Sequence, residues 1–370
     1  MIPLVPFRAL RPTAARAREF SVPRVEHLQA ADLAEAASGS PYSLAAVLQR
    51  GNAELLDELQ AAKALIHQTE QTFYMHRNVK GGHRCFGLVA CIQSEAFHNG
   101  SIRHHRQACS QRTEQWKGTV AATGVQMDSV IVGFHLNDEI LDLLEREMNE
   151  RPLLHVVADD SATHTMWLGT RSAQLMQAFA EVSKAYVLEG HHRTQALHTR
   201  EPVLALLVPL AHMIPQWSAR VLGPDSIPAW RRWLAMHGTA ESDPGIPPDG
   251  FADIGLPADH GKVNWFRFPL PTTPKEADAF GRTSDGRLNA CIHHITGVDA
   301  ERCSVRRPGQ RSVQVVSRWM TEKEVGGVVL LPQPDMAELL QIADQGVLLP
   351  IGSTWFEPSL RSGLWMHRSK

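Results

Sequence analysis

Residues 185–196 read AYVLEGHHRTQA, an apolar run followed by a polar turn. The first four residues predict a short buried strand, and the residues from Thr194 onward predict a helix that ends before Pro202. Residues 189–193 therefore lie on a turn that leads from a strand into a helix. Strands that alternate with helices are typical of α/β proteins, so we expect an α/β (mixed α+β) fold.

The sequence on both sides of this stretch continues the alternation. In residues 43–70 apolar positions recur near a period of 3.6 and predict helical structure, with a break at Gly51-Asn52. Two extended runs separated by Lys80-Gly81-Gly82 predict a hairpin. Further strands are expected at residues 129–134 and 203–214, and further helices at residues 138–148, 173–184 and 335–344, the first of these capped by Asn137 or Asp138.

Composition divides the chain into three parts. Residues 1–214 form an N-terminal α/β region that contains the turn. Residues 215–274 are rich in Pro and Gly and predict a long loop or an arm that covers a site. Residues 275–370 are expected to form a C-terminal α+β segment that packs on the same core.

Length and charge exclude several classes of protein. The 370 residues are 43% hydrophobic and 21% charged, which is typical of a folded globular chain. Lys+Arg 37 against Asp+Glu 39 gives a net charge of −2, which argues against a nucleic-acid partner. The apolar stretch 203–214 is interrupted by Pro209 and His212 and is too short to span a membrane. We expect a small-molecule ligand, no membrane contact and an undetermined oligomeric state.

The numbers and spacing of cysteine and histidine limit the kinds of site that we expect. The five cysteines lack CxxC spacing, and no secretory signal is evident, so we expect reduced thiols in a cytoplasmic protein. The 19 histidines include the pairs His104-His105, His191-His192 and His293-His294. Adjacent side chains diverge on a helix or a strand, so such pairs are poor chelates. We expect His293-His294 to be core residues.

The turn at 189–193 could bind an anion. A helix start presents backbone N–H groups and a positive dipole end, and Gly190 allows a ligand to approach the backbone closely. Arg193 could bind phosphate or carboxylate, and His191 and His192 could donate hydrogen bonds or relay protons. Glu189 could accept a proton or hold Mg²⁺ through water. The alternative is that Glu189 and Arg193 form a surface i,i+4 pair and the histidines cap the helix.

Two resemblances bear on this choice. Gly190-His191-His192-Arg193 with Ala196 resembles the Gly-x-x-Arg-x-x-Ala turn of the ParB and sulfiredoxin superfamily, and its closest form is the Asp-Gly-His-His-Arg motif of free L-serine kinases. Nearly the whole chain resembles the bacterial family of domain of unknown function 1015. The matching stretches are residues 6–12 (PFRALRP), 41–43 (PYS), 87–90 (GLVA), 99–105 (NGSIRHH), 189–193 (EGHHR), 353–358 (STWFEP) and 362–364 (SGL).

The resemblance implies a ParB/sulfiredoxin-like nucleotide-binding core with additional α+β elements. It implies a kinase that transfers phosphate from ATP or ADP, with Mg²⁺, to the hydroxyl of free L-serine or a similar amino acid. The residue roles that it implies are catalysis by Glu189, His191 and His192; metal binding by Glu189; nucleotide binding by Gly190, His192, Arg193, Ser353 and Thr354; and substrate binding by Arg8, Arg11 and His105.

Three positions depart from the family pattern. Glu189 stands where the family usually has Asp, Arg106 where it has Glu after the histidine, and Gly352 where it has Lys. The last two changes remove a candidate base and a candidate phosphate ligand. Two other functions therefore stay open: a non-catalytic homologue that binds a nucleotide or an amino acid, and a nucleotide or phosphoester hydrolase that uses the same turn.

Overall fold

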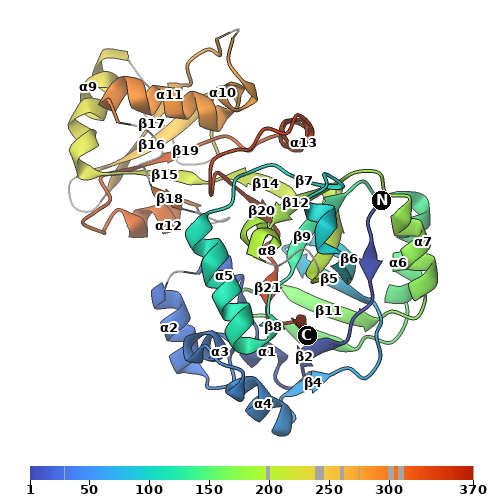
Figure 1. The fold of residues 1–370 in the computed structure, drawn as a ribbon. Coiled ribbons are helices and arrows are strands. Elements are labelled where there is room, and N and C mark those ends of the chain that lie inside the picture. The colour runs from blue at the N-terminus through green and yellow to red at the C-terminus, as the bar shows by residue number, and fades with distance from the viewer. Residues whose placement is uncertain are drawn as a thin grey trace. The chain divides into compact units, whose positions relative to one another are not determined.

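The computed structural model describes residues 1–28, 30–196, 201–237, 246–258, 262–274, 276–298, 304–306 and 312–369. It confirms a mixed α/β fold (Figure 1). The chain divides into two compact units. The first comprises Met1–His104, Ala108–Ile214 and Phe356–Lys370, and the second comprises His105–Gln107 and Pro215–Trp355.

The first unit is built on a large mixed sheet. The order of its strands is β10 (Leu154–Val157), β11 (Thr163–Leu168), β5 (Tyr74–Lys80), β6 (His83–Ile92), β13 (Val203–Pro209), β9 (Val130–Phe134), β12 (Ala185–Glu189) and β7 (Ile102–His104), and β1 (Leu4–Val5) pairs with β6. The pairs β13–β9 and β12–β7 are parallel and the others are antiparallel. The predicted hairpin is confirmed, since Lys80 is opposite His83 across Gly81-Gly82.

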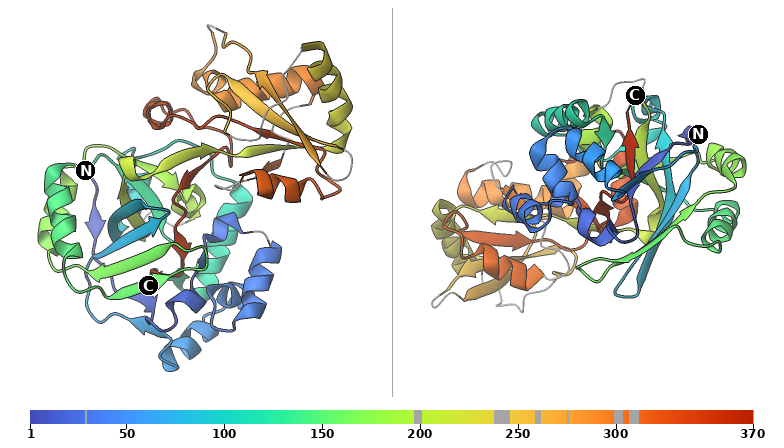
Figure 2. Two further views of the ribbon diagram at one scale, coloured as in Figure 1. Left: turned by 180° about the vertical axis from the view of Figure 1, so that it is seen from behind. Right: turned by 90° about the horizontal axis from the view of Figure 1, so that it is seen from below.

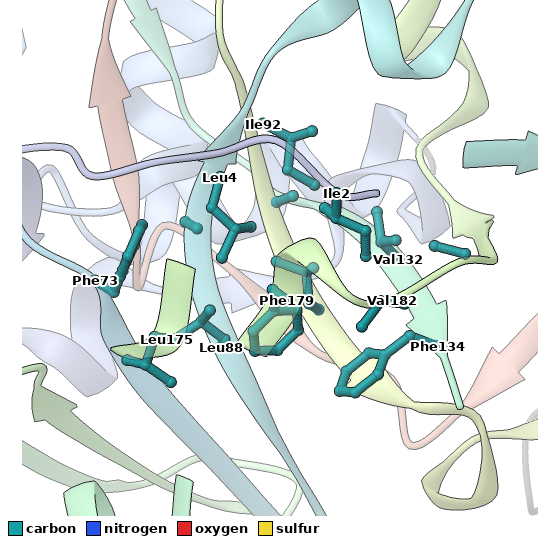
Figure 3. Packing of buried hydrophobic residues seen from close by; sticks show 14 of the residues in the cluster. Ile2, Leu4, Phe73, Leu88, Ile92, Val132, Phe134, Leu175, Phe179 and Val182 are labelled. Carbon is teal, nitrogen blue, oxygen red and sulfur yellow. The ribbon is translucent and has the colours of Figure 1, made fainter. Parts of the chain in front are cut away.

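Helices α6 (Asp138–Met148) and α7 (Ser172–Ala180) cover one face of this sheet (Figure 1). Leu88 and Val132 from the strands meet Leu175 and Phe179 from α7 in a continuous apolar cluster (Figure 3). Burying such side chains supplies the main driving force for folding. The predicted cap of α6 is confirmed, because the Asn137 side chain accepts a hydrogen bond from the backbone N–H at position 140.

The opposite face of the same strands carries buried polar side chains, because successive residues of a strand point to opposite faces. His76 Nε2 lies 3.0 Å from His164 Nδ1, and the amide of Asn78 lies 3.3 Å from His164 Nε2. Burial lowers the pKa of His164 to about 4, and the positive charges of Arg361 and Lys80 act in the same direction. Burial also lowers the pKa of His76 well below its usual value. Both rings are therefore neutral near pH 7.

A second layer of the first unit contains a small sheet in the order β4 (Leu65–His67), β2 (Ala9–Pro12), β22 (Met366–Arg368) and β8 (Val125–Gln126). Helices α2, α3 and α4 gather beside it (Figures 1 and 2). The other elements of this unit are α1 (Ala17–Phe20), β3 (Val22–Pro23), η1 (Val25–His27), α2 (Ala30–Gly39), α3 (Leu44–Arg50), α4 (Glu54–Ala61), η2 (Ser94–Phe97), α5 (Ser110–Thr123), α8 (His191–Ala196), η3 (Leu210–His212) and β21 (Arg361–Ser362).

The helical prediction for residues 43–70 is right in its first two thirds. Gly51 ends α3 with a left-handed φ of 66°, and α4 follows after a short connection. Beyond α4 the chain is extended in β4, which pairs with β2. The apolar spacing of Ile66 fits a helix, but strand pairing determines its conformation.

The second unit contains an antiparallel sheet in the order β17 (Val263–Pro269), β16 (Phe251–Pro257), β19 (Gly327–Leu330), β15 (Ala219–Leu222) and β18 (Ser304–Arg306). Helices α9 and α11 lie on one side of this sheet and α12 lies on the other (Figure 1). Its other elements are η4 (Pro224–Ser226), α9 (Ile227–His237), α10 (Ala279–Arg282), α11 (Ser284–Thr296), α12 (Ser312–Trp319) and α13 (Met336–Asp344). The chain crosses between the units within β14 (Ile214–Trp217) and β20 (Thr354–Glu357).

Two predictions for this unit are wrong. Residues 215–274 are not a long loop: their described part contains β15, α9, β16 and β17. Ala252, Ile254 and Leu256 are buried on one face of β16, a period-two pattern that the neighbouring Pro and Gly residues obscured. The pair His293-His294 is exposed in the last turn of α11 rather than buried in a core.

Candidate functional site

The motif at 189–193 lies where β12 passes directly into α8. The strand ends at Glu189, Gly190 turns the chain with a φ of 94°, and the helix begins at His191 rather than at Thr194 as predicted. A Cβ on Gly190 would lie 2.6 Å from Arg193 Nη1 and 3.1 Å from Val130 Cα. Glycine is therefore required here both for its backbone conformation and to let the arginine fold back beneath the turn.

Glu189 is held by an arginine from a distant part of the chain. Arg24 Nε lies 2.7 Å from Glu189 Oε2, and Arg24 Nη1 lies 3.4 Å from Asp128 Oδ1. Arg24 Nη2 also donates a hydrogen bond of 2.7 Å to the carbonyl oxygen of Ser129. The side chain of Arg24 is 0% exposed, so one buried guanidinium connects the strand end to the start of β9.

Arg193 makes a parallel set of contacts. Its Nη2 lies 2.7 Å from Asp128 Oδ2 and 3.1 Å from Glu26 Oε1, and its Nη1 donates to the carbonyl oxygen of Ser129 at 3.1 Å. The guanidinium carbon lies 4.8 Å from the centre of the Trp116 ring, a cation–π distance. The alternative of a surface pair between Glu189 and Arg193 is wrong, because each residue is buried with other partners.

We call Arg24, Glu26, Asp128, Glu189 and Arg193 the turn cluster. All five side chains are 5% exposed or less. Burial alone would lower the pKa of Arg24, but the three carboxylates around it raise that pKa above its usual value. Buried charges persist only when they are paired. The turn is therefore an organised ionic site, with carboxylates beside its arginines, rather than a bare anion cradle.

The two histidines of the motif are also buried. His192 Nδ1 accepts a hydrogen bond of 2.9 Å from the backbone N–H of Cys109, which fixes its ring against the start of α5. The His191 ring packs edge-on against His104, with ring centres 5.5 Å apart. Burial lowers the pKa of His104. Three imidazole rings, those of His104, His191 and His192, therefore lie on this side of the turn.

A second carboxyl group lies near Glu189. The backbone N–H of Phe356 points to Glu189 Oε1 at 3.4 Å, so the next residue, Glu357, is brought close to the turn. Burial raises the pKa of Glu357, and the charges of Glu189 and Asp160 raise it further. Glu357 accepts a hydrogen bond of 2.8 Å from the backbone N–H of Ser359. It is a candidate proton donor or acceptor that the sequence did not single out.

The other predicted site residues fall into separate groups. Arg11 is buried and donates to the carbonyl oxygen of Pro12 at 3.1 Å, whereas Arg8 is exposed and lines a cavity. In the second unit His105 Nε2 lies 2.8 Å from Thr354 Oγ1. Ser353 Oγ donates to a backbone carbonyl at 2.9 Å within the same unit. The structure thus brings His105 and Thr354 together in the second unit. It keeps residues 189–193 together in the first unit.

The fit of a metal ion can be tested on Glu189. Oε2 already has a guanidinium nitrogen at 2.7 Å, which takes the direction that a cation would occupy. Within the described residues, no group of three or more His, Cys, Asp or Glu side chains could hold a metal ion. Direct Mg²⁺ binding by Glu189 therefore does not fit the geometry.

A cavity of about 320 Å³ adjoins the turn cluster. Glu26 and Trp116, both in contact with Arg193, line it together with Arg112 and Gln115. An aromatic ring beside an arginine and an amide can bind a planar, polar ligand.

Sequence reasoning missed Arg24, Glu26 and Asp128. Arg24 lies between β3 and η1, Glu26 lies within η1 and Asp128 lies shortly before β9, positions that also suit surface residues. Arg24 and Glu189 are 165 positions apart, and a single sequence carries no signal that pairs them. Only Asp128, directly before the predicted strand at 129–134, had a local context that could have indicated a role.

Comparison with known proteins identifies the family of this chain. The family model described as "Protein of unknown function (DUF1015)" matches residues 4–201, which is more than half of the chain. The chain belongs to this family, as the sequence resemblance predicts. The match lies almost wholly in the first unit and includes the turn. No curated protein matches the chain.

Similar solved structures are distant in sequence. SbnI with a C-terminal truncation from Staphylococcus aureus is 14% identical, with a TM-score of 0.40, and the match covers 76% of this chain and 88% of that one. A mutant free serine kinase in complex with AMP is 11% identical, with a TM-score of 0.37 and coverage of 69% and 84%. Another mutant of a free serine kinase, in complex with ADP, is 12% identical with a TM-score of 0.36, covering 69% and 84%.

The part of the chain that the structure describes contains no helix with both the length and the apolar character needed to cross a membrane.

Proposed function

We propose that this protein is a nucleotide-dependent phosphotransferase that acts on the hydroxyl group of free L-serine or a similar small hydroxy amino acid. The observation that carries the proposal is the position of the Glu189 carboxylate, fixed by Arg24 directly before the left-handed Gly190. The resemblance of the Gly-His-His-Arg turn to the free L-serine kinase motif supports the same assignment.

Phosphoryl transfer depends on positioning and on charge neutralisation. Glu189 would accept the hydrogen bond of the attacking hydroxyl, and Arg24 holds the carboxylate in position. ATP or ADP would bind against the start of α8, with its base in the cavity lined by Trp116. Mg²⁺ would travel with the nucleotide phosphates. Arg193, which already contacts two carboxylates, would hold the turn in shape rather than carry the phosphate.

The test is incubation with Mg²⁺, ATP or ADP and a panel of hydroxy amino acids, read by ³¹P NMR and mass spectrometry. We expect phosphoserine or a related phosphoester. Glu189→Gln keeps the shape of the side chain and should lower the rate about 100-fold or more, the range of general base catalysis. Glu145→Gln, an exposed change on α6, is the matched control and should leave the rate unchanged.

A second candidate is a homologue that binds a nucleotide or an amino acid without turnover. Both arginines of the turn cluster are engaged by the protein's own carboxylates, and this observation favours it. Thermal stabilisation by nucleotide with no product from any acceptor would support this candidate and refute the kinase. Release of inorganic phosphate without an acceptor would instead indicate a hydrolase.

A further inference from the structure

A cavity of about 520 Å³ lies in the first unit beside β2 and β22. Its volume is in the range of small-molecule sites, roughly 300–1,000 Å³. The charged and imidazole side chains that line it are Arg8, His67, Glu201, His367 and Arg368. Its lining therefore combines apolar side chains with several nitrogen donors.

Arg8 is the positive group of this cavity that an anion would meet. Arg368 also lines the cavity, but its guanidinium is paired with Asp57 on α4 at 2.8 Å, and Glu201 adds one negative charge. Burial lowers the pKa of His67, and the charges of Arg368 and Arg8 lower it further. These two arginines are thus close enough to His67 to disfavour a third positive charge there.

His367 lies in the same electrostatic environment as His67. Burial lowers its pKa to about 4, and His67 acts in the same direction. Two neutral imidazoles therefore stand beside two guanidinium groups. An anion that entered the cavity would favour protonation of both rings, since an opposite charge nearby stabilises the charged form.

Gln126 separates this cavity from the turn cluster. Its side-chain amide donates to the carbonyl oxygen of Pro202 at 2.8 Å and accepts from the backbone N–H of Leu204 at 2.8 Å. Because both ends of the amide are engaged, the side chain forms a fixed wall. A ligand in the cavity would not touch Glu189 or Arg193.

We propose that this cavity is a binding site for a small anion, a carboxylate or a phosphate monoester, with Arg8 as its main ligand and His67 as a second donor. A guanidinium binds either group through two parallel N–H bonds. Arg8 is exposed, so its guanidinium can turn toward a ligand without breaking the core. The site shares no residue with the turn cluster, so its ligand binding can be tested separately from the proposed phosphotransferase activity.

The test is an NMR titration of the His67 and His367 ring signals with two probes, inorganic phosphate and malonate. We expect saturable shifts and a rise in the pKa of His67 on binding. Arg8→Gln should weaken binding about tenfold, the effect of one charge-assisted contact. Arg146→Gln on the exposed face of α6 is the matched control and should bind as the wild type does.

Each outcome is decisive. Shifts with phosphate alone assign phosphate monoesters, and shifts with malonate alone assign carboxylates; both support the site. Absence of saturable shifts with either probe overturns it, as does equal affinity in Arg8→Gln. Arg8→Lys, which keeps the charge but loses the planar fork, should bind between the wild type and Arg8→Gln. Loss of kinase activity in Glu189→Gln with unchanged phosphate binding would separate this site from the proposed function.

Discussion

Replacing Arg24 with Met should destabilise the protein strongly. The guanidinium lies 2.7 Å from Glu189, 3.4 Å from Asp128 and 2.7 Å from the carbonyl oxygen of Ser129, and none of it is exposed. Methionine fills much of the same space but leaves the buried Glu189 carboxylate without its cation, whereas Asp128 keeps Arg193 at 2.7 Å. Removing one partner of a buried ion pair costs about 3–5 kcal/mol. We expect a loss of that size in the free energy of unfolding.

Urea unfolding followed by circular dichroism measures this loss. The matched control is Arg18→Met, whose ion pair with Asp159 has the same 2.7 Å distance but side chains that are 67% and 68% exposed. An exposed pair contributes below about 1 kcal/mol. In the double variant with Glu189→Gln, the loss from Arg24→Met should be smaller, because less uncompensated charge is left. A loss in Arg24→Met no larger than that in Arg18→Met would refute the reasoning.

Two further predictions concern the turn and the sheet. Gly190→Ala should lower the free energy of unfolding by about 1–3 kcal/mol, since the φ of Gly190 is 94° and the new Cβ would lie 3.1 Å from Val130 Cα. The control is Gly81→Ala, in a left-handed position with open space around it, which should lower the free energy of unfolding less. Equal unfolding midpoints for the two variants would contradict this prediction. Folding lowers the pKa of His164 from 6.5 to about 4, so the unfolded chain binds the proton of this ring more tightly than the folded chain does. The free energy of unfolding should therefore fall as the pH falls from 6.5 toward 4, and His164 should contribute about 3 kcal/mol to this loss. Unfolding curves across that pH range should show a shallower slope for His164→Gln, and an unchanged slope would show that His164 does not titrate on unfolding.

The elements that the sequence predicted well are those with local signals. The Gly81-Gly82 hairpin, the cap at Asn137 and the buried strand at 185–188 each depend on residues that lie within a few positions of one another. The start of α8 was placed three residues too late, because His191 and His192 are weak helix formers and their helical conformation depends on Gly190 and on burial.

The parts that the sequence could not predict depend on contacts between distant segments. The sequence places the turn motif between a strand and a helix, but its electrostatic character comes from Arg24 and Asp128, which approach it only when β9 and the N-terminal segment pack against β12. Composition also gives the wrong prediction for residues 215–274. Proline and glycine favour a loop there, and the alternation of apolar and other residues in β16 is too short to indicate a strand.

The path of the chain has a consequence for how the protein is made. Strand β22 fills the place between β2 and β8, and β21 pairs with β3, so the last fifteen residues complete structures begun by the first thirty. During synthesis the N-terminal unit cannot complete these two sheets until β21 and β22 have been made. The whole second unit is translated before them. A chain that stops at Trp355 would lose β21 and β22, and with them Phe356, whose N–H points to Glu189.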